Sequence, residues 1–413
     1  MTASNPHLPS SAHAIDNSTS TVLARCAEWI AADPELAAGL SEIDSIAQFR
    51  DALITLVGAR MTVADAAHLA TLGFDRPAPR RHPIASWPLS SRRGWQPLAL
   101  EWGASGAELV WGCGATSDDL PFHELTLANV RSRPLNRWFA VRTSLTAEFV
   151  AELEADMLPL CGFILHMSRC GSTLIAQTLK AWAGTRVLSE PGVFDTALMA
   201  ALAGGDPGWL AVRGVLAALR QPAPTERRVV LKLDAWHALA LTQLRTLMPG
   251  VPWLFAYRDP LEVLASHARE SGRHTAPGML PEAWLGAEPA LPLSPIEHAA
   301  RVLGALCAAV LPHASAKNLV NHCELVEHDE HELPVALIER IPLWFGLDPS
   351  EVDHARFTTA LSQHAKKQHE VYVDDRVDKR EAASEPVHAA AACWIAPHYA
   401  TLEAIRTGCS SGS

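Results

Sequence analysis

Apolar and polar positions follow two different periods along the chain, and they predict helices first and short strands later. Between residues 21 and 72 apolar residues recur at helical spacing, as at Val22, Cys26 and Ile30. Two short apolar runs within residues 98–111 flank a Gly-Ala-Ser-Gly turn, which predicts a β-hairpin. No chemistry is evident in this part, so a structural or protein-interaction role is the default interpretation.

From about residue 156 onward, short apolar runs alternate with helical patterns. Each run is short enough for a buried strand and is followed by polar turn residues or a helix start. Five such runs are expected as strands, at residues 161–165, 186–188, 228–233, 251–257 and 319–322.

The composition and charge of the chain argue against some classes of binding partner. The chain has 413 residues, of which 48% are hydrophobic, enough for a sizeable core and two or so domains. A formal net charge of −11 argues against general nucleic-acid or anionic-membrane binding, so an anionic ligand needs a local basic pocket. The eight cysteines are well spaced, which favours a reduced, cytoplasmic protein. We expect neither a signal peptide nor a membrane span.

The turn after the run 161–165 carries the first candidate chemistry. It reads Ser-Arg-Cys-Gly-Ser-Thr and leads into a helical pattern, an arrangement that presents backbone N–H groups to a phosphate. Gly171 lets the backbone approach the anion, and Arg169 adds a charged fork. The predicted anion-binding residues are Arg169, Cys170, Gly171, Ser172, Thr173 and Leu174.

This turn lacks the first glycine and the lysine of the usual ATP- or GTP-binding loop, which disfavours hydrolysis of either nucleotide. It resembles instead the 5′-phosphosulfate loop of the sulfotransferase superfamily, Pro-Lys/Arg-Ser-Gly-Thr/Ser-Thr. Ser168 replaces the common proline and Cys170 the common serine. The resemblance covers residues 159 to about 400. It implies 3′-phosphoadenosine 5′-phosphosulfate (PAPS) as sulfonate donor and adenosine 3′,5′-bisphosphate as product.

The resemblance also implies the fold class, which is α/β: a P-loop-like domain with a central parallel sheet flanked by helices. The residue patterns before this domain predict a mostly helical N-terminal region with a small β element. We expect a disordered tail over 1–20, the helical region with its hairpin over 21–155, the sulfotransferase-like domain over 156–405, and a loose tail over 406–413.

A second motif follows the run 251–257. Asp259 and Pro260 are residues that helices prefer at their start. These preferences do not explain Arg258, or Ser266 eight residues later. The family's 3′-phosphate motif has this arginine–serine spacing. The resemblance therefore implies that Arg258 pairs with the 3′-phosphate and that Ser266 donates its hydroxyl.

Candidate catalytic residues follow two other strands. Lys232, at the end of a buried run, is costly to bury without an anionic partner. Glu190 follows the run 186–188, at the edge where ligands bind to parallel sheets, and can act as a general base. In the family such a lysine contacts the sulfonate and such a glutamate is the base. Cytosolic members carry a catalytic histidine where this chain has Asp234, so Asp234 stays an alternative base and His237 a third.

Other segments give weaker signals. The basic stretch 362–369 resembles the family's late loop and implies that Lys366 or Lys367 contacts the nucleotide, although a solvated helix end stays an alternative. The Gly- and Pro-rich stretch 271–295 is expected near the acceptor. We interpret residues 76–93 as a linker and 130–137 as a solvated basic loop. The histidines His322, His328 and His331 fit no closed zinc pattern, so no metal is expected.

These residues predict a PAPS-dependent sulfotransferase that moves a sulfonate group in line to a hydroxyl or amine of a small-molecule, carbohydrate or peptide acceptor. Arg169 and Lys232 would stabilise the developing negative charge without a metal. Two alternatives stay open: a P-loop nucleotide kinase or other phosphotransferase, and a non-catalytic nucleotide-binding protein on a sulfotransferase scaffold. The sequence does not indicate the acceptor, the oligomeric state or the role of residues 1–155.

Overall fold

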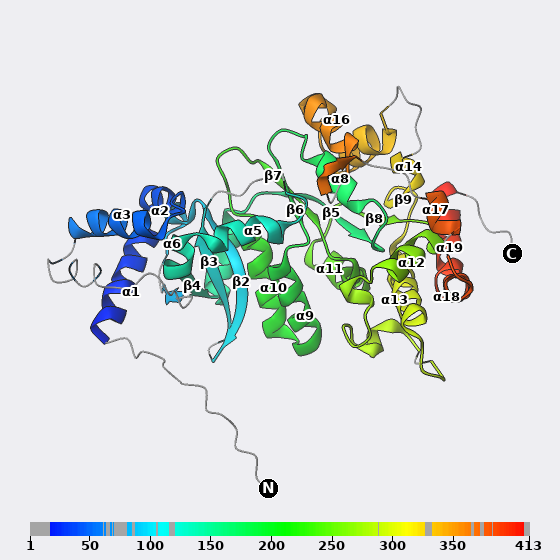
Figure 1. The fold of residues 1–413 in the computed structure, drawn as a ribbon, viewed down its shortest axis with the longest axis horizontal. Coiled ribbons are helices and arrows are strands. Elements are labelled where there is room, and N and C mark those ends of the chain that lie inside the picture. Colours follow the sequence, from blue (N-terminus) through cyan, green and yellow to red (C-terminus); the bar gives the residue numbers. More distant parts are fainter. Residues whose placement is uncertain are drawn as a thin grey trace, which may run out of the picture. The chain divides into compact units, whose positions relative to one another are not determined.

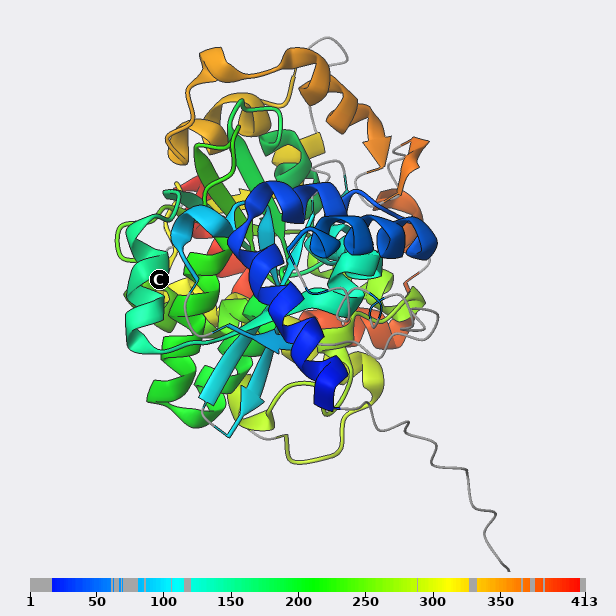
Figure 2. The same ribbon diagram turned by 90° about the vertical axis from the view of Figure 1, so that its left-hand side faces the viewer.

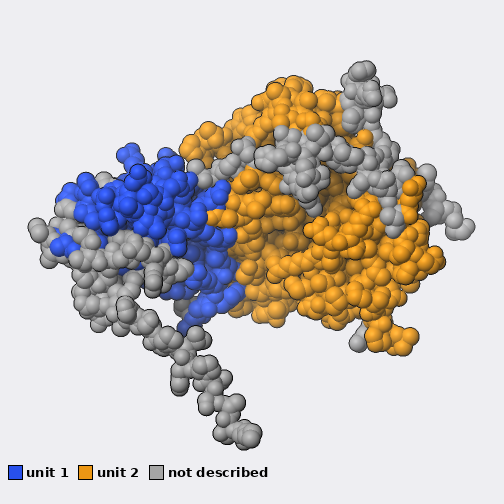
Figure 3. All heavy atoms as spheres, viewed as in Figure 1, with its two compact units in different colours: residues 1–115, 129–144 blue, residues 116–128, 145–413 orange. Residues whose placement is uncertain are grey.

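The computed structural model forms two compact units, which Figure 3 colours separately: residues 1–115 with 129–144, and residues 116–128 with 145–413. It describes residues 17–60, 62, 67, 69, 81–84, 87–104, 106–114, 120–287, 289–326, 333–364, 367–371, 376–381 and 383–408.

The sequence places the division at residue 155, whereas the second unit already includes helix α7 (Ala147–Ala155). This helix packs on α10 (Asp206–Leu219). The side-chain amide of Gln221 also donates to the Leu153 carbonyl at 2.9 Å. These contacts explain why α7 clusters with the second unit.

The first unit combines the predicted helices and hairpin with two further strands. Its sheet has the order β1-β4-β3-β2, with β2 and β3 antiparallel and β1 parallel to β4. Helix α1 packs on β1 and β4, and Figure 2 shows it in dark blue in front of the strands. The elements are α1 (Asn17–Ala32), α2 (Pro34–Ser41), α3 (Ile46–Gly58), β1 (Arg81–Pro83), η1 (Leu89–Arg92), β2 (Trp95–Gly103), β3 (Gly106–Cys113), α6 (Pro134–Phe139) and β4 (Ala140–Ser144).

Two predictions for this unit are wrong. The supposed linker contains β1 and η1, and the supposed basic loop 130–137 contains the end of α5 (His123–Ser132) and most of α6. The reason is burial: Leu135 is buried, and the Asn136 side chain accepts from the Cys113 N–H at 2.7 Å and donates to its carbonyl at 2.8 Å. This amide ties α6 to β3, a contact that local sequence does not reveal.

The second unit is built on a five-stranded parallel sheet with the order β6-β7-β5-β8-β9, which confirms the predicted fold class. All five residues of β8 are buried, as expected for a strand covered on both faces. The strands are β5 (Leu160–His166), β6 (Thr185–Ser189), β7 (Arg228–Lys232), β8 (Trp253–Tyr257) and β9 (Leu319–Asn321).

Helices cover both faces of this sheet. Figure 1 shows α8 and α16 on one side and α11, α12 and α13 on the other. The chain therefore leaves β5 toward one face of the sheet and leaves β7 and β8 toward the other face. Open α/β sheets bind their ligands at the carboxyl ends of the strands, at the point where the direction of the connections changes. The helices and remaining strands are α8 (Ser172–Leu179), α9 (Gly192–Gly204), η2 (Ala235–Ala240), α11 (Leu241–Leu247), α12 (Pro260–Arg269), η3 (Arg273–Thr275), η4 (Glu282–Leu285), α13 (Pro295–Val310), η5 (Leu311–His313), α14 (Cys323–Val326), the π-helix η6 (Ala336–Arg340), α15 (Ile341–Trp344), η7 (Pro349–Glu351), α16 (His354–Ser362), β10 (Gln363–His364), β11 (Lys367–Val371), α17 (Arg376–Glu381), α18 (Glu385–Trp394) and α19 (Ala396–Thr407).

Some helices are divided where the sequence predicts one. The sequence pattern of residues 389–405 predicts one helix, but the structure has two there, α18 and α19, because Pro397 lies in the first turn of α19 and cannot continue α18. The amphipathic pattern of residues 236–248 also predicts one helix, but this segment begins as the 3-10 turn η2 before α11. In the part of the chain that is described, no helix is long and apolar enough to span a membrane.

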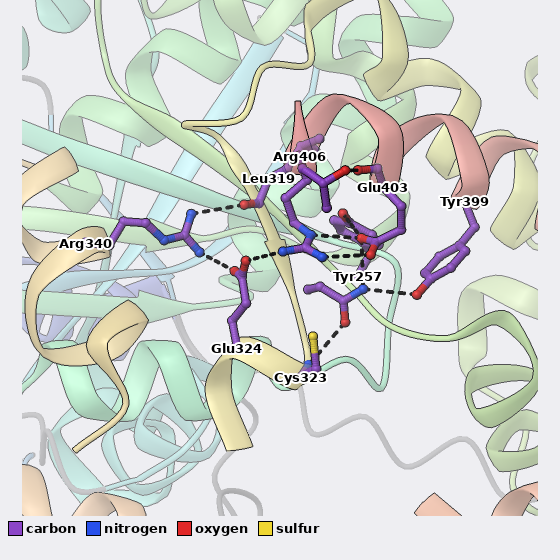
Figure 4. A network of polar contacts seen from close by, with 10 residues as sticks. Tyr257, Leu319, Cys323, Glu324, Arg340, Tyr399, Glu403 and Arg406 are labelled. Carbon is purple, nitrogen blue, oxygen red and sulfur yellow. Dashed lines mark hydrogen bonds and ion pairs between the residues drawn. The ribbon is translucent and has the colours of Figure 1, made fainter. Parts of the chain in front are cut away.

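A polar network fixes α19 to the ends of β8 and β9 (Figure 4). Glu403 accepts from the Tyr257 hydroxyl and, at 3.0 Å, from the Asn321 amide. Arg406 donates to Glu403 at 2.8 Å and to Glu324 at 2.6 Å. Burial alone would raise the pKa of Glu403, but the bonds from Arg406 and Tyr257 lower it to about 2. The carboxylate is therefore ionised and anchors the strand ends that precede Arg258 and His322.

Candidate active site

The loop after β5 has an unusual backbone. Ser168 and Arg169 have φ of 75° and 50°, and Gly171, with φ of 89°, caps α8. A non-glycine residue held in this left-handed region costs about 1–3 kcal/mol. The neighbouring strand end holds the loop in place: the Met167 N–H and the Cys170 thiol both donate to the Ala256 carbonyl, at 3.0 Å each.

The predicted anion-binding residues lie together at the start of α8. Ser172 and Thr173 are buried. Within the described ranges, no protein acceptor is found for the N–H groups of Gly171, Thr173 and Leu174. A methyl group on Gly171 would lie 2.8 Å from His322 Nδ1 and 2.7 Å from Leu325 Cδ1. The glycine is thus required by space as well as by conformation, and the donors suit a bound anion.

Lys232 and Glu190 meet beside this loop. Their strands are neighbours, with Ser189 opposite Lys232, and the Glu190 N–H donates to the Lys232 carbonyl at 2.7 Å. The Lys232 ammonium forms an ion pair with Glu190 Oε1 and lies 5.7 Å from the Phe122 ring centroid. The lysine side chain is 1% exposed and the glutamate 27%, so the pair has a buried cationic end and an open anionic end.

His166, which the sequence analysis missed, completes the group. Its Nε2 lies 3.4 Å from Glu190 Oε1 and 3.1 Å from the Leu233 carbonyl oxygen. Its Nδ1 accepts from the Ser168 N–H at 3.0 Å. The available signal was a polar residue ending an apolar run immediately before a glycine turn.

The electrostatics keep Glu190 ionised. Burial alone would raise the pKa of this carboxyl, but the Lys232 charge and the contacts with His166 hold it well below its usual range. Lys232 and His166 both contact Oε1. Oε1 therefore fixes the carboxylate, and Oε2 is the oxygen that can accept a proton from a substrate.

The second predicted motif lies next to the loop. Arg258 is buried, and its backbone N–H donates to the Met167 sulfur at 3.2 Å. Its Nε donates to Glu262 at 2.6 Å. The loop residue Arg169 donates to the Ser266 hydroxyl oxygen at 3.1 Å. The structure therefore brings the two motifs, 97 residues apart at these positions, into direct contact.

Comparison with known proteins adds little to this geometry. No protein-family model and no curated protein matches the chain. One similar solved structure is that of sulfotransferase STF9 from Mycobacterium avium, at 15% sequence identity and a TM-score of 0.37, covering 64% of this chain and 83% of that one. The functional assignment of the site therefore rests on its own residues.

The alternative bases are placed differently. Asp234 caps η2 and is partly buried, and its N–H donates to His237 Nδ1 at 3.2 Å. The other nitrogen of His237 lies 3.2 Å from Asp195 Oδ1, which also accepts from the Trp236 indole at 2.6 Å. His237 is fully buried with both ring nitrogens engaged, which makes it a poor base.

The remaining predicted residues are only partly described. Lys366, His328 and His331 lie outside the described residues, and of Lys367 only the backbone, in β11, is described. The nucleotide contact proposed for either lysine stays a prediction. In the described part of the chain, no three His, Cys, Asp or Glu side chains are grouped to hold a metal ion.

Proposed function

We propose that this chain is a sulfotransferase that takes its sulfonate from PAPS and transfers it to a hydroxyl or amine acceptor. The observation that carries the proposal is the contact between Arg169 of the glycine loop and Ser266 of the second motif, at 3.1 Å. It places the two motifs close enough for one nucleotide, anionic at both its 5′ and 3′ ends, to contact both.

The chemistry of the donors fits such a nucleotide. Backbone N–H groups at the start of α8 and the cations Arg169, Lys232 and Arg258 suit phosphate and sulfate oxygens. The charges of Lys232 and Arg258 both act on the Cys170 thiol, although its burial still raises the pKa of that thiol. The two cations therefore lie near the loop. The PAPS sulfonate is already activated, because adenosine 3′,5′-bisphosphate is its leaving group.

Each residue of the site then has its own role in binding or in sulfonate transfer. The loop donors and Arg169 hold the 5′ end, and Arg258 with Ser266 holds the 3′ end. Lys232 stabilises the negative charge that develops on the bridging oxygen of the bisphosphate as the sulfonate is transferred to the acceptor. An anion bound beside Lys232 weakens the ion pair between Lys232 and Glu190. This raises the pKa of the Glu190 carboxyl and makes it a stronger base. Glu190 Oε2 accepts the acceptor's proton.

Calorimetry tests the donor assignment. Wild-type protein should bind adenosine 3′,5′-bisphosphate more tightly than adenosine 5′-monophosphate and Mg-ATP. In Arg258→Ala the bisphosphate affinity should fall about 10- to 100-fold, as expected for a charge-assisted bond, while monophosphate binding changes little. Arg213→Ala, which removes an exposed ion pair with Glu154, is the matched control. Equal losses for both ligands would remove the 3′-phosphate assignment.

The same measurements address the alternatives. Preferential binding of Mg-ATP would favour a kinase or another phosphotransferase. Binding of the bisphosphate without sulfonate transfer to phenolic, sugar or amine acceptors would favour a non-catalytic nucleotide-binding protein.

The base is assigned by comparing Glu190→Gln with Asp234→Asn. The first should lose sulfonate turnover at least about 100-fold while nucleotide binding survives, because general bases contribute about 10²–10⁴-fold. The second should keep most of its turnover. If only Asp234→Asn loses turnover, Asp234 is the base.

A further inference from the structure

His166 is the last residue of the central strand β5, and the residue is 5% exposed. Each ring nitrogen contacts a different part of the site. Nδ1 accepts from the N–H of Ser168, a loop residue with φ of 75°. Nε2 lies 3.1 Å from the Leu233 carbonyl oxygen, just beyond the end of β7, and 3.4 Å from Glu190 Oε1, just beyond the end of β6.

These contacts determine where the ring proton lies. A backbone N–H can only donate, so Nδ1 must be the acceptor and the proton must be on Nε2. Nε2 then donates toward Leu233 and Glu190. Burial, followed by the nearby Lys232 charge, lowers the pKa of His166 to about 4, although Glu190 and Asp234 act in the opposite direction. The ring is therefore neutral at pH 7, and its contact with Glu190 is not an ion pair.

We infer that His166 is a positioning residue with two separable roles: its Nδ1 holds the phosphate-binding loop in its left-handed conformation, and its Nε2–H orients Glu190 for proton transfer. This inference rests on the proposed function for the second role only. The first role concerns the protein's own backbone and holds whatever the ligand is.

A purely structural histidine would behave differently. If the ring only filled space in the core, any smaller polar side chain would affect loop and carboxylate alike. The two nitrogens serve different elements, so substitutions that keep one nitrogen and remove the other should separate the effects. Asparagine can place an amide oxygen near the position of Nδ1, and glutamine can place an amide N–H near that of Nε2.

The test compares His166→Asn with His166→Gln in the full-length protein. His166→Asn should bind adenosine 3′,5′-bisphosphate within about twofold of wild type but lose sulfonate turnover about tenfold, with a changed pH profile of kcat. His166→Gln should show the reverse bias, with binding weakened about fivefold to tenfold, as for one lost hydrogen bond, and kcat less affected. Hydrogen exchange at the Ser168 amide should accelerate in His166→Gln but not in His166→Asn.

The state of the His166 ring can also be measured in the wild-type protein. Nitrogen NMR of the wild-type ring should show a neutral Nε2–H tautomer between pH 6 and 8. A ring that is charged there, or protonated on Nδ1, overturns the inference even if both variants fail to fold. Equal behaviour of the two variants in binding, turnover and exchange also overturns it. If wild-type protein binds no nucleotide, the proposed function fails, while the exchange and NMR readouts still decide whether His166 holds the loop.

Discussion

At the scale of single residues, the candidate site is built around a buried cation that faces a partly exposed anion. Lys232 is 1% exposed and Glu190 is 27% exposed, so the two partners differ in how well water can replace the lost contact. Removing the glutamate leaves a buried ammonium without its carboxylate, whereas removing the lysine leaves a carboxylate that water can reach.

Glu190→Gln should therefore destabilise the protein more than Lys232→Met does. We expect Glu190→Gln to lower the free energy of unfolding by about 3 kcal/mol, which is typical when one partner of a buried ion pair is removed. Lys232→Met should lower it by less. The double variant should recover part of the difference, because it removes both charges. Urea unfolding of the three variants measures this. Equal losses in the two single variants would contradict the asymmetry.

The buried His166 gives stability a defined pH dependence. Its pKa is about 4 in the folded protein, below the ordinary 6.5, so the unfolded chain binds the extra proton between these values. Stability should be greatest above pH 6.5 and should fall as the pH is lowered toward 4, by up to the order of 3 kcal/mol from this group. His166→Asn should lack this part of the slope in denaturant unfolding at pH 7, 5.5 and 4.5. An unchanged slope would contradict it.

At the scale of elements, the glycine loop depends on one residue that has neither space nor freedom for a side chain. Gly171→Ala would place a methyl group 2.7 Å from Leu325 Cδ1 at φ of 89°. We expect a stability loss of about 2–4 kcal/mol and weaker nucleotide binding. Gly250→Ala is the matched control, because its φ is 75° but no atom lies within 4 Å. Gly250→Ala should lose only the stability that an alanine costs in the left-handed backbone region, about 1–2 kcal/mol. Its nucleotide affinity should not change. Calorimetry and thermal unfolding of both variants provide the comparison.

The elements also show what local sequence can predict. Buried strands, the hairpin and the start of α13 follow from short-range patterns, the last from a Ser294–Glu297 capping box. The short strand β1 leaves no local pattern, because only three residues pair with β4 in parallel. The helix break before α19 was signalled by Pro397, but the continuing apolar pattern concealed it.

The sequence predicts several individual residues of the site but not the contacts between them. Glu190 and Lys232 were both expected, each because it ends a buried run. Their ion pair exists because β6 lies beside β7, and strand order is a property of the tertiary structure. His166 and Asp195 were missed for a related reason, since each acquires its partners only when other strand ends and helix starts surround it.

At the scale of the whole molecule, the end of the chain supports the site from a distance. Glu403 on α19 accepts from Tyr257 and Asn321, which immediately precede Arg258 and His322. Glu403→Ala should destabilise the protein by about 2–4 kcal/mol, because it leaves buried polar partners unsatisfied, and it should also weaken bisphosphate binding. Thr401→Ala, on the exposed side of the same helix, should change neither. If Glu403→Ala unfolds earlier but binds nucleotide as wild type does, the network has no role in positioning the site.

The proposed function requires that one nucleotide spans the glycine loop and the Arg258–Ser266 motif. A crystal structure with bound adenosine 3′,5′-bisphosphate examines this requirement. The 5′-phosphate should lie on the backbone N–H groups at the start of α8, and the 3′-phosphate within hydrogen-bonding distance of Arg258 and Ser266. A nucleotide that contacts only one of the two motifs, or binds elsewhere, would contradict it.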